Sequence, residues 1–558
     1  MEGQTSRKRF PLKYGWIFLF LACLASWVMF YSENITDHIT CRLSELKMSV
    51  LTTKAPTPNT TRSKRPTEPP EPANICSFHS VLPEDVLEAE LLKESITWPE
   101  TPSLPPNFSL NDTSSPAHST FAVLPRNGGG SWRVGDQLEV LIQIADFHGR
   151  RKSSGGDVLL ARLHNPTLSA GVAGRVLDHR NGSYTAAFSL LWEGSAQVEV
   201  TLVHPSEAVT VLERITQQNP DRVSLKGNFR AGSVTEATSC NVCLKEPPEK
   251  LCNFTDIRTG EPWFCYKPKK LKPMEEKLFQ RGVNMKVFIQ SSGPSNITIL
   301  PKLKGRGVIT QPAGYYYQGI WRALDGSTVH QLTNNSAISQ CLSGKVLHLY
   351  GDSTIRQWFE YLISAAPDLK KFDLKSLTQT GPFMALNYAK NILVTFRCHA
   401  PPIRFGHLPI SQIRYIANEL DGVVGGENTA VVIGVWSHFS TFPVEVYIRR
   451  LLTIRRAVER LLTRAPGTLV IIRTANPKAL SLYETLTNSD WFSIQRDKIL
   501  RTIFKGVNVR FVDAWEMTLA HHLPHNLHPQ LPIIRNMLNV VLSHICSPAG
   551  NFKKATKL

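Results

Sequence analysis

The residues with the clearest chemical potential are Gly351-Asp352-Ser353, which join a predicted strand to a predicted helix. A short apolar run over residues 345–350 predicts the strand, and apolar residues recur at helical spacing from Ile355 to Leu362. A serine on such a turn exposes its hydroxyl at the carboxyl edge of the sheet, and the helix N-terminus offers N–H groups to a developing anion. The motif predicts that Ser353 is a nucleophile framed by Gly351 and Asp352, and a purely structural turn is the alternative.

A nucleophilic serine needs a base, and the base needs a group that orients it. Residues after the strand predicted at 507–512 reach the same edge of a parallel sheet, and carboxylates and histidines stand there. We expect His528 to be the base and Asp513 to orient it, with Glu516 as the second choice for the orienting carboxylate.

Two further features of this edge are less specific. The loop after the strand at 429–436 carries Ser437 and His438 as candidate oxyanion donors, although its tryptophan could make the loop part of the core instead. Four histidines between residues 521 and 528 could bind zinc. Because Pro524 interrupts any continuous helix and no His-Glu-x-x-His pattern is present, we expect no metal site.

The C-terminal region, residues 341–548, alternates short strands with helical patterns. Its strands are nearly continuously apolar, as is typical of parallel strands buried on both faces. They are predicted at 345–350, 391–396, 429–436, 468–473 and 507–512. The region is therefore predicted to be one α/β domain, and Cys341 and Cys546, which bracket it, are candidates for a disulfide that ties its ends.

Short β runs separated by Gly-rich and Asn-Gly turns fill residues 119–225. Their spacing predicts an antiparallel β-sandwich of immunoglobulin or filamin type with a binding or structural role. Residues 226–275 form a small module that holds four clustered cysteines, and residues 276–340 are predicted to be a connector with some strand. The cysteine spacing fits zinc poorly, so disulfides are the better interpretation in an oxidising compartment; the four are Cys240, Cys243, Cys252 and Cys265.

The N-terminal segment predicts a membrane anchor. Residues 1–13 are basic, and residues 14–31 carry no charged side chain over a length near the minimum for a spanning helix. Bulky residues stand where a signal peptidase would cut, so a signal-anchor is favoured over a cleaved signal peptide. The basic tail then stays in the cytosol and the remainder enters the lumen, starting with a Pro- and Thr-rich stem or linker at 32–118.

This single-pass type II topology predicts a glycoprotein of the Golgi or secretory-pathway lumen or the cell surface, with a secreted protein as the alternative. Candidate acceptor sequons all follow the anchor, at Asn34, Asn59, Asn107, Asn111, Asn181, Asn253, Asn296 and Asn334. The formal net charge of +18 fits an acidic glycan, an anionic membrane surface or nucleic acid. Since no nucleic-acid-binding module is recognisable, we expect no nucleic-acid partner.

The order of these motifs resembles a known family. Gly351-Asp352-Ser353 after the first strand, with Asp and His after the last, is similar to the SGNH/PC-esterase group of acyl esterases and acyltransferases. The β region and the cysteine module, which reads Cys-Asn-Val-Cys, Cys-Asn-Phe-Thr and Glu-Pro-Trp-Phe-Cys, resemble neurexophilin. Together they match the neurexophilin and PC-esterase domain (NXPE) family. The resemblance implies a flavodoxin-like three-layer α/β/α domain, O-acyl chemistry on glycans, and Ser353 as the nucleophile.

Two departures from the group's pattern concern the site. The usual Asp-x-x-His becomes His525-Asn526-Leu527-His528, and Trp436-Ser437-His438 replaces the usual Gly-x-Asn of the oxyanion hole. Two functions follow as hypotheses. The first is a membrane-anchored lumenal O-acetyltransferase or acyl esterase that acts on glycans, without a bound cofactor and with an acyl donor such as acetyl-CoA if it is a transferase. The second is a non-catalytic binding glycoprotein whose β-sandwich engages a cell-surface receptor.

Overall fold

The computed structural model describes residues 83–126, 128–219, 225–231, 234–244, 250–268, 288–292, 295–300, 312–376, 379–403 and 413–546. They fall into two compact units, and the smaller contains the described residues between 226 and 257 and between 262 and 268. The predicted tail at 1–13, the predicted anchor at 14–31 and the sequons at Asn34 and Asn59 lie outside the described residues. Within the described ranges, no helix combines the length and apolarity needed to cross a membrane.

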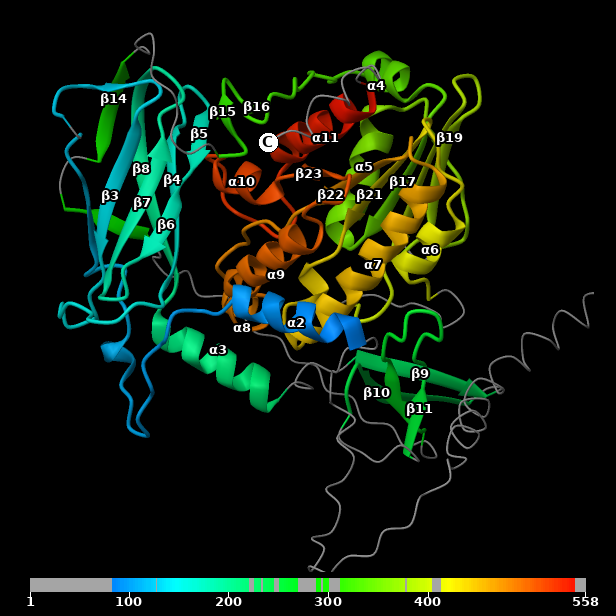
Figure 1. Ribbon diagram of the computed structural model, residues 1–558, viewed down its shortest axis with the longest axis horizontal. Helices are drawn as coiled ribbons and strands as arrows, with labels where there is room; N and C mark the ends of the chain where they lie inside the picture. Colours follow the sequence, from blue (N-terminus) through cyan, green and yellow to red (C-terminus); the bar gives the residue numbers. More distant parts are fainter. Residues whose placement is uncertain are drawn as a thin grey trace, which may run out of the picture. The chain divides into compact units, whose positions relative to one another are not determined.

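The larger unit contains a seven-stranded sheet with the order β18-β19-β20-β17-β21-β22-β23 (Figure 1). Neighbouring strands from β20 to β23 run parallel, whereas β18 and β19 pair antiparallel at one edge. This arrangement confirms the predicted α/β class. The strands are β17 (Val346–Gly351), β18 (Lys370–Lys371), β19 (Phe383–Asn387), β20 (Ile392–Cys398), β21 (Thr429–Gly434), β22 (Leu469–Arg473) and β23 (Arg510–Val512).

The helices that cover this sheet form two groups, each in contact within itself. The first group is α4 (Asn335–Leu342), α5 (Ser353–Ala365), α10 (Ala514–Leu519) and α11 (Leu531–Cys546). The second is α2 (Pro83–Ser95), α6 (Ile416–Gly422), α7 (Val444–Arg464) and α9 (Asp490–Ile503), and the short helix α8 (Leu482–Thr487) precedes α9. Since β21 and β22 are buried along nearly their whole length, both faces of the central sheet are covered.

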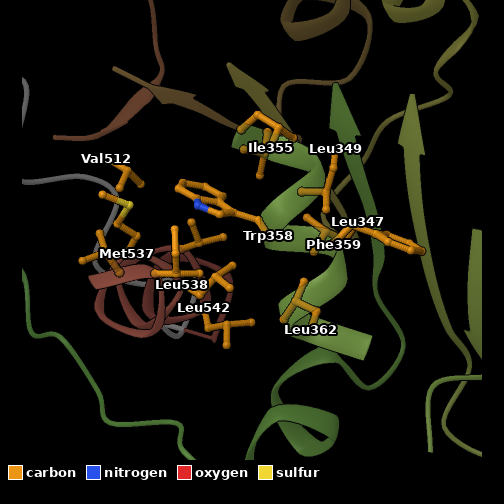
Figure 2. Close-up of a cluster of buried hydrophobic side chains, with 14 of the residues drawn as sticks. Leu347, Leu349, Ile355, Trp358, Phe359, Leu362, Val512, Met537, Leu538 and Leu542 are labelled. Carbon is orange, nitrogen blue, oxygen red and sulfur yellow. The ribbon is translucent and has the colours of Figure 1, made fainter. Parts of the chain in front are cut away.

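The first group packs on the sheet through a large hydrophobic core. Figure 2 shows the Trp358 indole projecting from α5 toward Met537 and Leu538 of α11. Phe359, one residue further along α5, packs instead against Phe383 and neighbouring aromatic rings of the sheet. The helical spacing of these apolar residues lets α5 bury one face along most of its length, and that fixes the position of its first residue at the end of β17.

A second sheet of twelve strands lies in the same unit, in the order β16-β15-β5-β4-β8-β13-β1-β3-β7-β6, with β14 and β2 beside this path. Its inward residues share one hydrophobic core, to which β3, β4 and β8 all contribute. The strands are β1 (Thr120–Val123), β2 (Trp132–Arg133), β3 (Gln137–Gln143), β4 (Val158–Asn165), β5 (Ala170–Ala173), β6 (Arg175–Asp178), β7 (Ser183–Ser189), β8 (Gly194–His204), β13 (Phe288–Ser291), β14 (Asn296–Leu300), β15 (Gly314–Tyr317) and β16 (Ile320–Ala323).

The predicted connector contributes strands to this sheet. Residues 276–340 are predicted to be a connector with some strand, and β13 to β16 come from this segment and join the sheet. The strand β13 pairs with both β1 and β8 and so links the two halves into one continuous sheet. The hairpin β15–β16 extends its edge beyond β5.

Part of the predicted stem is also folded. Helix α2 packs on α7, where Asp85 pairs with Arg456 and Glu88 accepts a hydrogen bond of 2.7 Å from Nη2 of Arg455. The helix α3 (Ser206–Gln218) follows β8. Among the candidate sequons, the side chains of Asn107, Asn111, Asn181, Asn296 and Asn334 are exposed, and that of Asn253 is half-buried.

The smaller unit contains a four-stranded sheet with the order β11-β12-β10-β9. Its strands are β9 (Leu225–Ala231), β10 (Val234–Asn241), β11 (Leu251–Asn253) and β12 (Phe264–Tyr266). A disulfide joins Cys240 to Cys265 across β10 and β12, and Cys243 and Cys252 are disulfide-bonded as well. In the larger unit Cys341 and Cys546 form the predicted disulfide. These bonds indicate an extracellular or lumenal location.

The core around α5 yields a stability prediction. Phe359→Ala removes a ring that is 1% exposed and leaves a cavity, so the free energy of unfolding should fall by about 3–5 kcal/mol. Phe372→Ala is the matched control, because that ring is 40% exposed and its loss should cost less than about 1 kcal/mol. Denaturant unfolding followed by tryptophan fluorescence measures both. Equal losses in the two variants would contradict this account of the core.

Candidate active site

The site begins where β17 ends, at a glycine that the packing requires. Gly351 is flanked by Cys398 of β20 and Gly434 of β21. A Cβ atom at Gly351 would lie 2.1 Å from the Gly434 carbonyl oxygen, closer than any real contact. The glycine therefore lets the strand ends approach one another, and the next two residues emerge at the carboxyl edge of the sheet.

Asp352 caps helix α5. Its Oδ1 accepts hydrogen bonds from the Thr354 N–H at 2.9 Å and from the Thr354 hydroxyl at 2.6 Å. Ser353 is then the first residue of the helix, where its N–H has no acceptor within the helix and lies at the positive end of the dipole. Nucleophile and N-terminal N–H groups thus stand together, as the turn motif predicts.

His528 lies directly against this serine. The distance from His528 Nε2 to Ser353 Oγ is 2.9 Å, which is a hydrogen bond. With Nε2 unprotonated, the serine hydroxyl donates to it, and this is the arrangement that a general base requires. The two residues are far apart in the sequence, so the contact depends on the loop between α10 and α11.

That loop is held from two sides. Gln357, one turn after Ser353 on α5, donates from Nε2 to the Pro529 carbonyl at 2.8 Å. Asn476, which follows β22, donates from Nδ2 to the Asn526 carbonyl at 3.0 Å. These bonds flank His528 on both sides in the sequence and fix where its ring can lie. Neither residue is predicted from the sequence, although Asn476 is a polar residue just after a parallel strand, which is a usable signal.

The electrostatics around His528 favour a neutral imidazole with an anion nearby. Burial lowers the pKa of His528 below its ordinary value near 6.5, and the Asp352 carboxylate opposes this shift by raising it. Asp352 is itself fully buried. Burial raises the pKa of Asp352, but interactions with His438, the Thr354 hydroxyl, His399 and Arg473 outweigh burial and lower it to about 2. The carboxylate is therefore ionised beside the nucleophile.

The predicted oxyanion donors have other partners. The Ser437 N–H and hydroxyl both donate to Asp352 Oδ2, at 3.3 and 3.1 Å. His438 Nδ1 lies 3.0 Å from His399 Nε2, and His399 Nδ1 donates to the Ala400 carbonyl at 2.7 Å. Ser437 therefore holds Asp352 in place, and the expectation that Ser437 is a free donor to an oxyanion is wrong for this arrangement.

The predicted orienting carboxylates also lie elsewhere. Asp513 caps α10 by accepting from the Glu516 N–H at 2.9 Å, and it pairs with Arg501 at 2.8 Å. Glu516 Oε2 accepts from the Ala313 N–H at 2.7 Å, and burial raises the pKa of Glu516 to about 7. Neither carboxylate bonds to His528 in the described part of the chain, so assigning Asp513 as its orienter is wrong. A helix starts immediately after Asp513 and turns its side chain back toward that helix.

Two of the three remaining histidines of the loop stack on one another. The rings of His521 and His522 stack with centroids 4.5 Å apart, and the buried His525 Nε2 has no hydrogen-bond partner. Among the residues that the structure describes, no group of three or more His, Cys, Asp or Glu side chains is arranged to hold a metal ion.

Two regions of the chain match known protein families. The family model "Neurexophilin" matches residues 106–287, and the model "NXPE family member 4-like, C-terminal domain" matches residues 321–546. The chain belongs to the NXPE family. We therefore call residues 106–287 the neurexophilin domain and residues 321–546 the NXPE C-terminal domain, whose sheet is of the α/β class.

One solved structure is a distant match. It is an active-site mutant of a family two carbohydrate esterase from Clostridium thermocellum in complex with celluohexase, with 8% sequence identity and a TM-score of 0.21. The match covers 77% of this chain and 98% of that chain. Because the TM-score is so low, the fold assignment depends on the strand order and the family models.

The position of Asp513 yields a second prediction. Asp513→Asn keeps an acceptor for the helix cap and removes the charge that faces Arg501, so it should lower stability while changing little at Ser353. We expect the rate at which a fluorophosphonate labels Ser353 to stay within about threefold of wild type, since the carboxylate does not touch His528. A loss of more than about tenfold in a folded Asp513→Asn protein would restore Asp513 as the orienting acid.

The charge on Asp352 yields a third prediction, which concerns the pH dependence of labelling. Asp352→Asn can keep the Oδ1 cap of α5, but it removes the anion that raises the pKa of His528 and puts an NH2 group where Oδ2 accepts from Ser437. The pKa of His528 should fall further, so the acid limb of the labelling rate should move to lower pH, and the plateau rate should drop about tenfold because the imidazolium loses its counter-charge. Glu360→Gln is the control, since Glu360 raises the pKa of His528 less than Asp352 does and its loss should shift the acid limb less. A shift toward higher pH in Asp352→Asn would refute the electrostatic role.

Proposed function

We propose that this protein is an acyl-serine enzyme in which Ser353 is the nucleophile and His528 is the general base. The observation that carries the proposal is the 2.9 Å contact between His528 Nε2 and Ser353 Oγ at a helix N-terminus. The resemblance of Gly351-Asp352-Ser353 and the later His528 to the SGNH/PC-esterase pattern supports the same chemistry. Asp352 supplies the nearby negative charge, acting through His528 rather than on the substrate.

The reaction follows from these positions. The Ser353 hydroxyl attacks the acyl carbonyl carbon, and its proton passes to His528 Nε2. The bond to the leaving alcohol or thiol then breaks, and His528 gives that group the proton, which leaves an ester on Ser353. An acceptor hydroxyl next attacks this ester, passes its own proton to His528 and displaces Ser353, which takes the proton back. The Ser353 N–H faces the oxyanion that forms in both halves.

The acceptor decides the class of enzyme. A sugar hydroxyl makes it an O-acyltransferase that uses a donor such as acetyl-CoA, and water makes it an esterase. We favour an O-acetyltransferase on glycans, anchored by residues 14–31 in the Golgi or secretory-pathway lumen, because an anchor and stem before the folded region are typical of biosynthetic enzymes. The net charge of +18 favours an acidic glycan as substrate.

A second candidate function has its own support. Asp513 pairs with Arg501, and both Ser437 donors point at Asp352, so two parts of the usual esterase machinery have other tasks. Such structural use of these groups is compatible with a non-catalytic binding glycoprotein. In that case the neurexophilin domain would be the surface that binds a cell-surface receptor.

Covalent labelling distinguishes the two. Wild-type protein, Ser353→Ala and His528→Gln are treated with a fluorophosphonate probe, and the modified residue is located by mass spectrometry. We expect label on Ser353 in wild type, none there in Ser353→Ala, and labelling slowed by about 10²–10⁴-fold in His528→Gln. Absence of label in folded wild-type protein would refute the proposal that Ser353 is an activated nucleophile. The binding function would then be the remaining candidate.

A further inference from the structure

An arginine of the neurexophilin domain contacts the start of the loop that carries His528. Arg162, on β4, donates from Nη1 to the His521 carbonyl at 2.5 Å and lies 3.4 Å from the Leu523 carbonyl. Its Nη2 pairs with Glu199 of the neighbouring strand β8 at 2.8 Å. One planar guanidinium is thereby fixed on the sheet and bound to the loop at the same time.

A glycine beside it brings the two backbones into direct contact. Gly171 of β5 is opposite His164 of β4, and a Cβ atom at Gly171 would lie 2.0 Å from the Ala520 carbonyl oxygen. Ala520 is the last residue before the loop, so the sheet and the end of α10 meet here without a side chain between them. Any larger residue would have to move the start of the loop.

Further contacts extend this junction. Tyr316 of β15 packs edge-on against His521 with ring centroids 4.7 Å apart. The Trp321 N–H of β16 donates to Asn536 of α11 at 2.9 Å, and that asparagine returns a bond of 3.0 Å to the Gly319 carbonyl. The β15–β16 hairpin therefore contacts both helices that flank the loop, as the neighbouring labels β15, β16, α10 and α11 in Figure 1 indicate.

Histidines surround the guanidinium without adding charge to it. Burial lowers the pKa of His164 to about 4 and the pKa values of His521 and His525 to about 3, and the charge of Arg162 contributes to each shift. Arg162 and Glu199 are thus a charge pair among neutral rings. Because an ion pair made by a buried guanidinium that also bonds two carbonyls is geometrically demanding, it specifies one arrangement of the loop.

We infer that Arg162 is a positioning residue for the reaction, through which the β-sheet of the neurexophilin domain sets the place of His528 opposite Ser353. The loop is bonded near its start by Arg162 and on either side of His528 by Asn476 and Gln357. Loss of the first attachment frees residues 521–525 to shift. A displacement of about 1 Å at the base is enough to cost about 10²-fold in rate. This inference rests on the proposed role of His528.

The test is a double-mutant cycle on the full chain, with the rate of fluorophosphonate labelling at Ser353 as the readout. Arg162→Met keeps the aliphatic stem and loses every donor, and it should slow labelling about 10–100-fold, whereas Arg162→Lys should recover part of the rate. The same Arg162→Met change in a His528→Ala background, with added imidazole as a free base, should slow labelling less than about twofold, because a free base needs no positioning. Arg175→Met is the control, an exposed arginine on β6 of the same sheet.

A second measurement separates displacement of the loop from general misfolding. Gly171→Ala disturbs the backbone contact with Ala520, and Gly422→Ala, where a Cβ would meet nothing within 4 Å, is its control. In Gly171→Ala, amide hydrogen exchange should rise in peptides that cover residues 520–530 and stay unchanged over β21. Equal slowing of labelling in the His528 and His528→Ala backgrounds, or none in either, would overturn the positioning role. If wild-type protein is not labelled at all, the proposed function has failed instead.

Discussion

The buried carboxylate of Asp352 is the group on which the rest of the candidate site depends. Removing a charge from water costs several kcal/mol unless hydrogen bonds replace the lost hydration. Here four hydrogen bonds, from the N–H and hydroxyl groups of Thr354 and Ser437, replace it. The first pair sets the N-terminus of α5, and the second sets the turn after β21. Ser353 lies between these two structures, so its position follows from the need to satisfy one anion.

This dependence explains which parts of the site the sequence could predict. The proximity of Ser353 and His528 could be predicted from the sequence, because parallel strands end at one edge of a sheet. That edge brings distant residues together whatever the exact course of their loops. Asp513 and Ser437 were misassigned because local contacts decided their orientation: a helix that starts at residue 514 and a neighbouring carboxylate at 352. Such contacts depend on tertiary positions that residue type and spacing do not specify. The strands β13 to β16 were hard to place for a related reason, since each is short and finds its partners far away in the sequence.

The two functions considered for the protein place different demands on the neurexophilin domain. A receptor ligand needs only an exposed face, whereas an enzyme of this architecture uses the opposite side of the same sheet to support a loop. Arg162 and Gly171 belong to that supporting side, and they are buried against the NXPE C-terminal domain rather than exposed. Binding and catalysis therefore make no competing claims on these residues.

The strand β15 carries a consequence for folding as a whole. Tyr316 lies in the hydrophobic core of the α/β sheet, whereas Tyr315 and Tyr317, which point the other way, pack on the core of the twelve-stranded sheet. One four-residue strand thus contributes side chains to both hydrophobic cores, and neither core is complete without it. The stabilities of the two cores should then be coupled, because residues of one strand contribute to both. A chain cut between the two family domains would leave each fragment with an open, apolar side, which makes the pair an inseparable folding unit.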